Sequence, residues 1–123
     1  MSKIVAVIGA SNNRQKFGNR AVRAFQRQGY TVLPINPHET EVEGLKAYAS
    51  VLDVPGPIDM ATLYVPPDIG EPLMDELAQK HIPEVWVNPG AESDALMARA
   101  RALQIQPIVA CSIVGIGQNP YDV

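Results

Sequence analysis

Short apolar runs alternate with amphipathic segments along the chain. The apolar runs are of strand length and cover residues 4–8, 30–35, 58–65, 85–87 and 107–110. Apolar side chains recur at helical spacing in residues 18–28, 68–81 and 93–103. This alternation predicts an α/β fold with an open parallel five-stranded sheet and helices on both faces.

Individual residues set the expected boundaries of these elements. Ser93 is a suitable N-cap for the third helix. Asp68, with Glu71 three residues later, suits the N-terminus of the second helix, but Pro72 is expected to interrupt the first turn, so regular helix should begin later. Residues 39–57 are expected to form a surface excursion with a short helical turn near 51–54, and the tail 112–123 is predicted to be loop.

The stretch from Gly9 to Gly18 suits a phosphate or pyrophosphate group. Gly9 ends the first apolar run, and a short polar loop with Ser11, Arg14 and Lys16 leads to the first helix. The start of a helix offers unpaired N–H groups and the positive end of the helix dipole. Because Ser11 replaces the second glycine of G-x-G-x-x-G and no P-loop sequence follows, a plain structural turn stays an alternative.

Ligands of open parallel sheets bind at the carboxyl ends of the strands. The expected ends are Gly9-Ala10-Ser11, Asn36-Pro37, Val65-Pro66-Pro67 and Asn88-Pro89-Gly90. These stiff, apolar rims suit a long amphiphilic ligand with a phosphate end. An NAD site normally has an acidic residue after the second strand, and the Asn36-Pro37-His38 sequence at that place argues against NAD.

Composition and charge narrow the classes of function. The chain has 123 residues, of which 46% are hydrophobic and 19% charged, and this suits a single domain over residues 1–123. Its formal net charge of −3 gives no basic excess for nucleic acid. No apolar run approaches the length of a membrane span, and no secretory leader is visible. With one cysteine, Cys111, the chain has no disulfide framework, and we expect a cytoplasmic protein.

Other polar residues have simpler structural explanations. Arg23 and Arg27 are expected on a solvated helix face, whereas Arg20, nearer the loop, is left open as a phosphate contact. His38 is expected in an exposed loop, and His81 in the last turn of the second helix, where a cation suits the dipole. Neither a catalytic triad nor a metal cluster is visible, so no catalytic residue and no metal site are predicted.

Several short motifs, taken in order and with their spacing, resemble the small CoA-binding-domain proteins. These motifs are Val7-Ile8-Gly9-Ala10-Ser11, Lys16-Phe17-Gly18-Asn19-Arg20, Gly29-Tyr30-Thr31-Val32, Ile35-Asn36-Pro37, Gly44, Ile58-Asp59 and Val85-Trp86. The resemblance runs from about Lys3 to Cys111 and extends to the N-terminal domain of succinyl-CoA synthetase α subunits. It implies a Rossmann-like domain that binds coenzyme A or an acyl-CoA at the strand ends. It implies no catalysis, because the phosphorylated histidine of the synthetase belongs to a later domain.

The resemblance also implies a set of binding residues. The loop from Gly9 to Asn12 would hold the pyrophosphate, and the later strand ends would lie beside the nucleotide and the pantetheine arm. Carried over by position, the CoA-binding residues are Gly9, Ala10, Ser11, Asn12, Arg14, Lys16, Asn36, Pro37, Val65, Pro66, Asn88, Pro89 and Gly90.

The chain departs from the family pattern at three places. His38 stands where members often have lysine, Asn88 replaces the usual glutamine, and Val109-Ala110 replaces the Asp-Arg pair before Cys111. These changes leave open an interaction protein that has lost its ligand. A second alternative is an NADP- or NAD-binding module that uses the same loop, with Arg14 as the contact for a 2′-phosphate. Cys111 is expected to be a buried, inert thiol, with a nucleophile or a partner for the CoA thiol as the alternatives. A protein partner is left unidentified.

Overall fold

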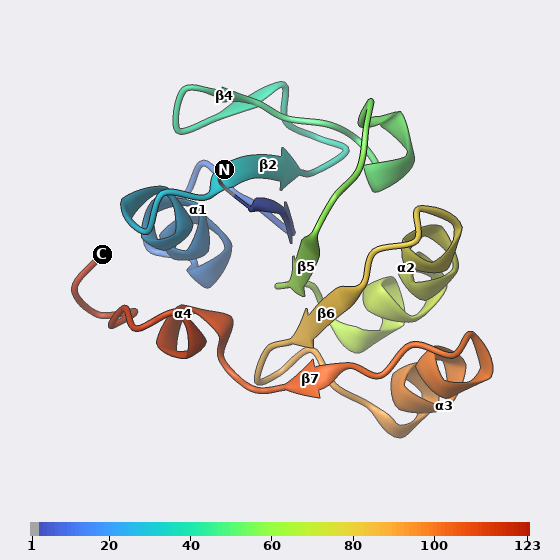
Figure 1. Ribbon diagram of the computed structural model, residues 1–123. Helices are drawn as coiled ribbons and strands as arrows, with labels where there is room; N and C mark the ends of the chain where they lie inside the picture. Colours follow the sequence, from blue (N-terminus) through green and yellow to red (C-terminus); the bar gives the residue numbers. More distant parts are fainter. Residues whose placement is uncertain (1–2) are drawn as a thin grey trace.

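Five parallel strands form the central sheet of the computed structural model, which describes residues 3–123 (Figure 1). The strands are β1 (Ile4–Ile8), β2 (Thr31–Ile35), β5 (Met60–Leu63), β6 (Glu84–Val87) and β7 (Ile108–Val109). Their order is β2-β1-β5-β6-β7, and every neighbouring pair is parallel. The strand order reverses between β1 and β5, which is where such sheets hold ligands. The predicted Rossmann-like α/β fold is confirmed.

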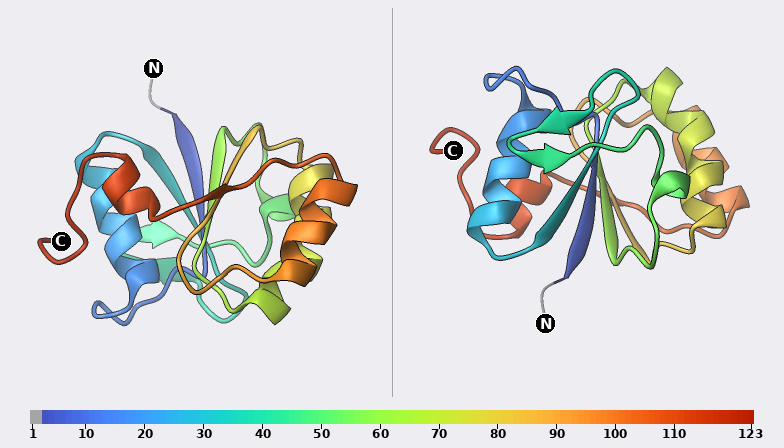
Figure 2. Two further views of the ribbon diagram at one scale, coloured as in Figure 1. Left: turned by 90° about the horizontal axis from the view of Figure 1, so that it is seen from below. Right: turned by 90° about the horizontal axis from the view of Figure 1, so that it is seen from above.

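Helices cover both faces of the sheet (Figure 2). Helices α1 (Phe17–Arg27) and α4 (Ser112–Gly115) lie on one face, and α2 (Pro67–Gln79) and α3 (Asp94–Ala102) lie on the other. Because strand side chains alternate, Val5 and Val7 of β1 pack in the core beneath α1, whereas Ala6 and Ile8 pack in the core beneath α2 and α3. None of the helices within residues 3–123 is long and apolar enough to cross a membrane.

Helix α2 begins earlier than predicted. It starts at Pro67 and continues through Pro72 without a break. Pro67 has no N–H to lose at the first helical position, and its fixed φ suits a helix start. Burial of Met74 and Leu77 against the sheet stabilises the helix beyond Pro72. The expectation of a later start was therefore wrong.

The tail is not entirely loop, which corrects a second expectation. Residues Ser112–Gly115 form the short helix α4, and the side chains of Ser112 and Ile113 are fully buried. Gly115 lies on the indole ring of Trp86, where an added Cβ would come within 2.7 Å of the ring. Contact with β6, which is distant in sequence, therefore stabilises this helix, and the residue pattern of the tail does not predict it.

The irregular stretch 39–57 contains a small hairpin that the sequence pattern did not reveal. Strands β3 (Glu41–Val42) and β4 (Leu45–Lys46) pair in antiparallel register. The expected helical turn near 51–54 is present as a 3-10 helix, η1 (Val51–Asp53).

Candidate functional site

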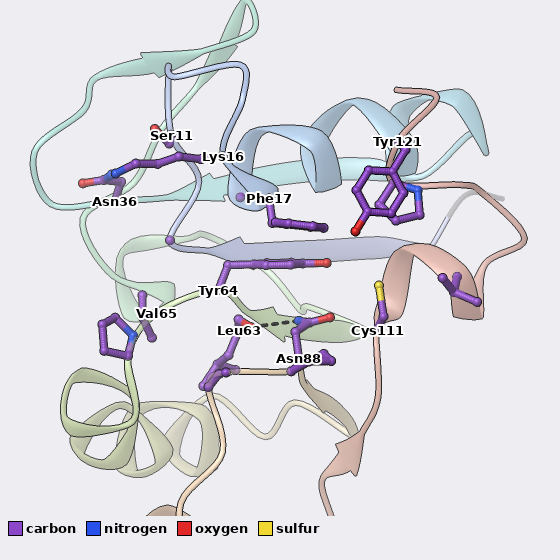
Figure 3. A pocket seen from close by; sticks show the side chains of 18 residues that line it. Ser11, Lys16, Phe17, Asn36, Leu63, Tyr64, Val65, Asn88, Cys111 and Tyr121 are labelled. Atoms are coloured by element: carbon purple, nitrogen blue, oxygen red, sulfur yellow. Dashed lines mark hydrogen bonds between the residues drawn. The ribbon is translucent and has the colours of Figure 1, made fainter.

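A cavity of about 850 Å³ lies at the carboxyl ends of β1, β5 and β6 (Figure 3). This volume falls within the range of small-molecule sites, about 300–1,000 Å³. Most of the residues predicted to bind the ligand line it, although they come from four separate parts of the chain. These are Gly9, Ser11, Lys16, Asn36, Val65, Pro66, Asn88, Pro89 and Gly90.

A second cavity of about 380 Å³ adjoins the first. Both cavities are lined by Gly9, Asn36, Val65 and Pro66, which form their common rim. The predicted residue Pro37 lines this second cavity and not the first. The polar side chains that line the second cavity include Ser50, which donates a hydrogen bond to Glu76.

The remaining predicted residues have structural partners. Ala10 is completely buried in the core. Asn12 Nδ2 donates to the main-chain oxygen of Glu41 at 2.9 Å, and Arg14 Nε lies 3.5 Å from a carboxylate oxygen of Glu43. Neither Asn12 nor Arg14 lines either of these two cavities, and their contacts hold the loop after β1 against the β3–β4 hairpin.

Close backbone packing brings the start of α1 to the end of β1. Gly9 has φ +93°, and a Cβ there would lie 2.6 Å from the main-chain oxygen of Tyr64. A Cβ on Gly18 would lie 2.1 Å from the main-chain oxygen of Gly9. Glycine at both positions therefore lets the loop turn tightly and brings the helix N-terminus to the cavity.

The N-terminus of α1 is a favourable place for an anion. Its N-cap residue, Lys16, makes no side-chain cap hydrogen bond, and the first turn has no acidic residue. Unpaired N–H groups and the helix dipole both favour negative charge at such an end. Among residues 3–123, Lys16 is the only charged side chain that lines the larger cavity, so no carboxylate opposes an anion there.

A buried polar network forms one side of the cavity. Asn88 Nδ2 donates to Thr62 Oγ1 at 2.7 Å and to the main-chain oxygen of Leu63 at 2.8 Å, and its Oδ1 accepts from the Ser112 N–H at 2.8 Å. The Ser112 hydroxyl lies 2.8 Å from Thr62 Oγ1 and 3.0 Å from the Tyr64 hydroxyl. The Asn88 amide thus positions α4 against β5 and β6, and its donors are already in use.

Burial raises the pKa of the Tyr64 hydroxyl to about 12, with a smaller rise from nearby Cys111, although hydrogen bonding to Ser112 and Thr62 acts in the opposite direction. Tyr64 therefore faces the cavity as a neutral phenol at physiological pH.

Cys111 differs from the expectation of a buried thiol. It is half-buried, has no disulfide partner within the described chain, and lines the cavity just after β7. Figure 3 shows its sulfur at the end of the cavity away from Lys16. His38 lies in an exposed loop beside the smaller cavity, and His81, beyond the end of α2 at φ +57°, lines neither cavity. No cluster of three or more His, Cys, Asp or Glu side chains suited to a metal occurs in residues 3–123.

Several lining residues have no local sequence signal. Tyr64 lies within an apolar run that predicts a buried strand, so its place in the lining is not apparent from the sequence. Phe17 directly follows the predicted phosphate loop. Val114, Pro120 and Tyr121 come from the tail. Only the folding of the tail back over the sheet brings these side chains to the cavity.

Sequence comparison finds relatives among the ADP-forming acetate–CoA ligases. The chain is 39% identical over 84 residues to subunit alpha of the ADP-forming acetate–CoA ligase II of Pyrococcus furiosus, a match that covers 68% of this chain and 18% of the relative. The chain therefore spans less than a fifth of that subunit.

Solved structures share the fold. A conserved hypothetical protein from Pyrococcus furiosus superposes with a TM-score of 0.85 at 33% identity, covering 94% of this chain and 99% of the other. The dinucleotide-forming acetyl-coenzyme A synthetase 1 of Ca. Korarchaeum cryptofilum, in complex with phosphate and ADP, superposes with a TM-score of 0.72 at 29% identity. That match covers 85% of this chain and 25% of the synthetase. The profile of the CoA binding domain family matches residues 3–116, and the chain belongs to this family.

Proposed function

We propose that the protein binds coenzyme A or an acyl-CoA across the two adjoining cavities, without catalysis of its own. The observation that carries the proposal is the uncapped N-terminus of α1, which opens on a cavity whose lining has Lys16 and no acidic side chain among the described residues. A pyrophosphate would be held there by main-chain N–H groups, the Ser11 hydroxyl and Lys16.

The two cavities match the two arms of such a ligand. The smaller cavity is mostly apolar, and its few polar groups include His38 and Glu76, so it would take the adenine. The larger cavity would take the pantetheine arm along Val65, Pro66 and the turn that starts at Asn88. Because the cavities share the rim at Gly9 and Asn36, one extended ligand can occupy both.

The proposal assigns no catalytic residue. The lining of the larger cavity has no imidazole or carboxylate within residues 3–123, and burial keeps the Tyr64 phenol protonated at neutral pH. The proposal places the protein in the cytoplasm, where a single free thiol stays reduced.

The test is calorimetric titration of ligand-free protein with CoA, acetyl-CoA, NADP and NAD. We expect micromolar binding of the CoA compounds and none of the dinucleotides. Ser11→Glu should weaken CoA binding at least tenfold, because it places a carboxylate where the pyrophosphate would lie. Gln15→Glu is the matched control, since it adds the same charge at an exposed position of the same loop outside the cavity.

Binding of NAD or NADP in preference to CoA would favour a dinucleotide module. If none of the four ligands binds to a folded sample, the result would favour an interaction protein that has kept the fold and lost the ligand. Equal CoA affinity of Ser11→Glu and the wild type would contradict the placement of the pyrophosphate.

A further inference from the structure

The larger cavity has a polar end and an apolar end. Figure 3 shows Ser11 and Lys16 at one end, and Tyr121 and Cys111 at the other, with the rings of Phe17 and Tyr64 between them. Within residues 3–123, no charged side chain lines the end that is distant from Lys16. A ligand with its phosphates at the polar end must therefore place its other end among apolar groups.

Large apolar side chains are left exposed around this apolar end. Phe17 is 42% exposed, Val114 59% and Tyr121 78%, and all three line the cavity. Single exposed apolar side chains are common, but a group of them around one cavity marks a binding surface. Their exposure is explained if part of a ligand covers them.

The C-terminal segment, residues 116–123, contributes Pro120 and Tyr121 to the lining of the cavity, and we call it the C-terminal strap. Side chains of α1 and its C-cap residue donate hydrogen bonds to its main-chain oxygens. The bonds run from Arg20 to Pro120 at 3.3 Å, from Arg27 to Asp122 at 3.1 Å and from Gln28 to Ile116 at 2.9 Å. The family match covers residues 3–116, so the strap beyond Ile116 lies outside the matched residues.

An aromatic contact fixes the strap beside the cavity. The rings of Phe17 and Tyr121 meet edge to face, with centroids 6.3 Å apart. The Arg20 guanidinium carbon lies 5.1 Å from the Phe17 ring centre and 5.8 Å from that of Tyr121. The Arg20 guanidinium therefore contacts two rings and the Pro120 carbonyl, and Arg20 is not among the residues that line the cavity.

We propose that the C-terminal strap selects the acyl group of the ligand, and that the ligand is an acyl-CoA with an uncharged, apolar acyl group of several carbons. This inference rests on the proposed function. The acyl group would lie against Phe17, Val114 and Tyr121, and a carboxylated acyl group would be disfavoured because no cation lines that end within the described chain.

The first test compares CoA, acetyl-CoA, butyryl-CoA, hexanoyl-CoA and succinyl-CoA on the wild-type chain by calorimetry. We expect affinity to rise about two- to fourfold for each added methylene until the apolar end is filled. Succinyl-CoA should bind at least tenfold more weakly than butyryl-CoA, which has the same number of acyl carbons.

The second test alters the C-terminal strap and the side chains that hold it. Tyr121→Ala should lower the ratio of hexanoyl-CoA to CoA affinity at least fivefold. Tyr121→Phe should keep the ratio, as should Asp122→Ala, which alters an exposed side chain that lines neither cavity. Arg27→Ala combined with Gln28→Ala should lower this ratio in the same direction, because it removes two of the three side-chain hydrogen bonds to the strap and leaves the lining residues unchanged.

Equal affinity for CoA and hexanoyl-CoA, an unchanged ratio in folded Tyr121→Ala, or tight binding of succinyl-CoA would overturn the inference and leave CoA binding in place. Failure of CoA and every acyl-CoA to bind would overturn the proposed function as well.

Discussion

The main-chain oxygen of Gly9 lies so close to Gly18 that a Cβ on Gly18 would come within 2.1 Å of it. This contact joins the end of β1 to the first turn of α1. Gly18→Ala should therefore push the helix start away from the strand, even though alanine favours helix. We expect a loss of about 1–3 kcal/mol in the free energy of unfolding by urea denaturation, together with weaker CoA binding.

Gln26→Ala is the control for this effect, because it places alanine at an exposed position of the same helix. It should leave stability within about 0.5 kcal/mol of the wild type. A Gly18→Ala protein as stable as the wild type would contradict the close packing.

Asn88 should be a major contributor to stability. Its amide makes three hydrogen bonds that join β5, β6 and the start of α4, and it is 3% exposed. Asn88→Ala leaves buried partners unsatisfied, so we expect a loss of about 2–4 kcal/mol in the free energy of unfolding. Chemical denaturation measures it, with the exposed amide Gln106→Ala as the control. A loss below about 0.5 kcal/mol would show that these contacts contribute little.

Stability should fall in alkaline solution because of Tyr64. Burial raises the pKa of this hydroxyl to about 12 in the folded state, against 10.0 when unperturbed. Above pH 10 the unfolded chain releases the proton first, so it binds fewer protons than the folded chain and stability falls as pH rises. The contribution is fully present below pH 10 and lost by about pH 12, amounting to roughly 2 kcal/mol.

Urea denaturation between pH 9 and pH 12 tests this prediction. Tyr64→Phe should show a shallower decline than the wild type, whereas Tyr121→Phe, which alters a ring that is 78% exposed, should decline as the wild type does. Parallel curves for the wild type and Tyr64→Phe would exclude Tyr64 as the cause.

Lys16 should contribute a salt-dependent part of CoA binding. Lys16→Gln removes the charge beside the proposed pyrophosphate, and we expect affinity to fall about three- to tenfold at low ionic strength and less in high salt. Titration at two salt concentrations measures the difference, and Lys3→Gln, outside the lining of both cavities, is the control. The same salt dependence in Lys16→Gln and the wild type would exclude a direct role for this charge.

The predicted strands and the three longer helices were recovered because their patterns are local. Buried parallel strands are continuous apolar runs, α1 has clear helical periodicity, and Ser93 caps α3 by accepting a hydrogen bond from the Leu96 N–H. Helix α4 and the β3–β4 hairpin escaped prediction because contacts with distant residues stabilise them. The same reason explains why Arg14 was assigned to the ligand, whereas it pairs with Glu43.

The sequence by itself determined the fold class, the family and the strand ends at which a ligand would lie, since each depends on residues that are adjacent in the chain. Tertiary structure decided which side chains face the cavity. In the folded chain Asn88 is hydrogen-bonded in the core, Tyr64 and Cys111 line the cavity, and Tyr121 lies at its apolar end. The physical reason is that burial and hydrogen-bond partners depend on distances in space, which local residue patterns do not encode.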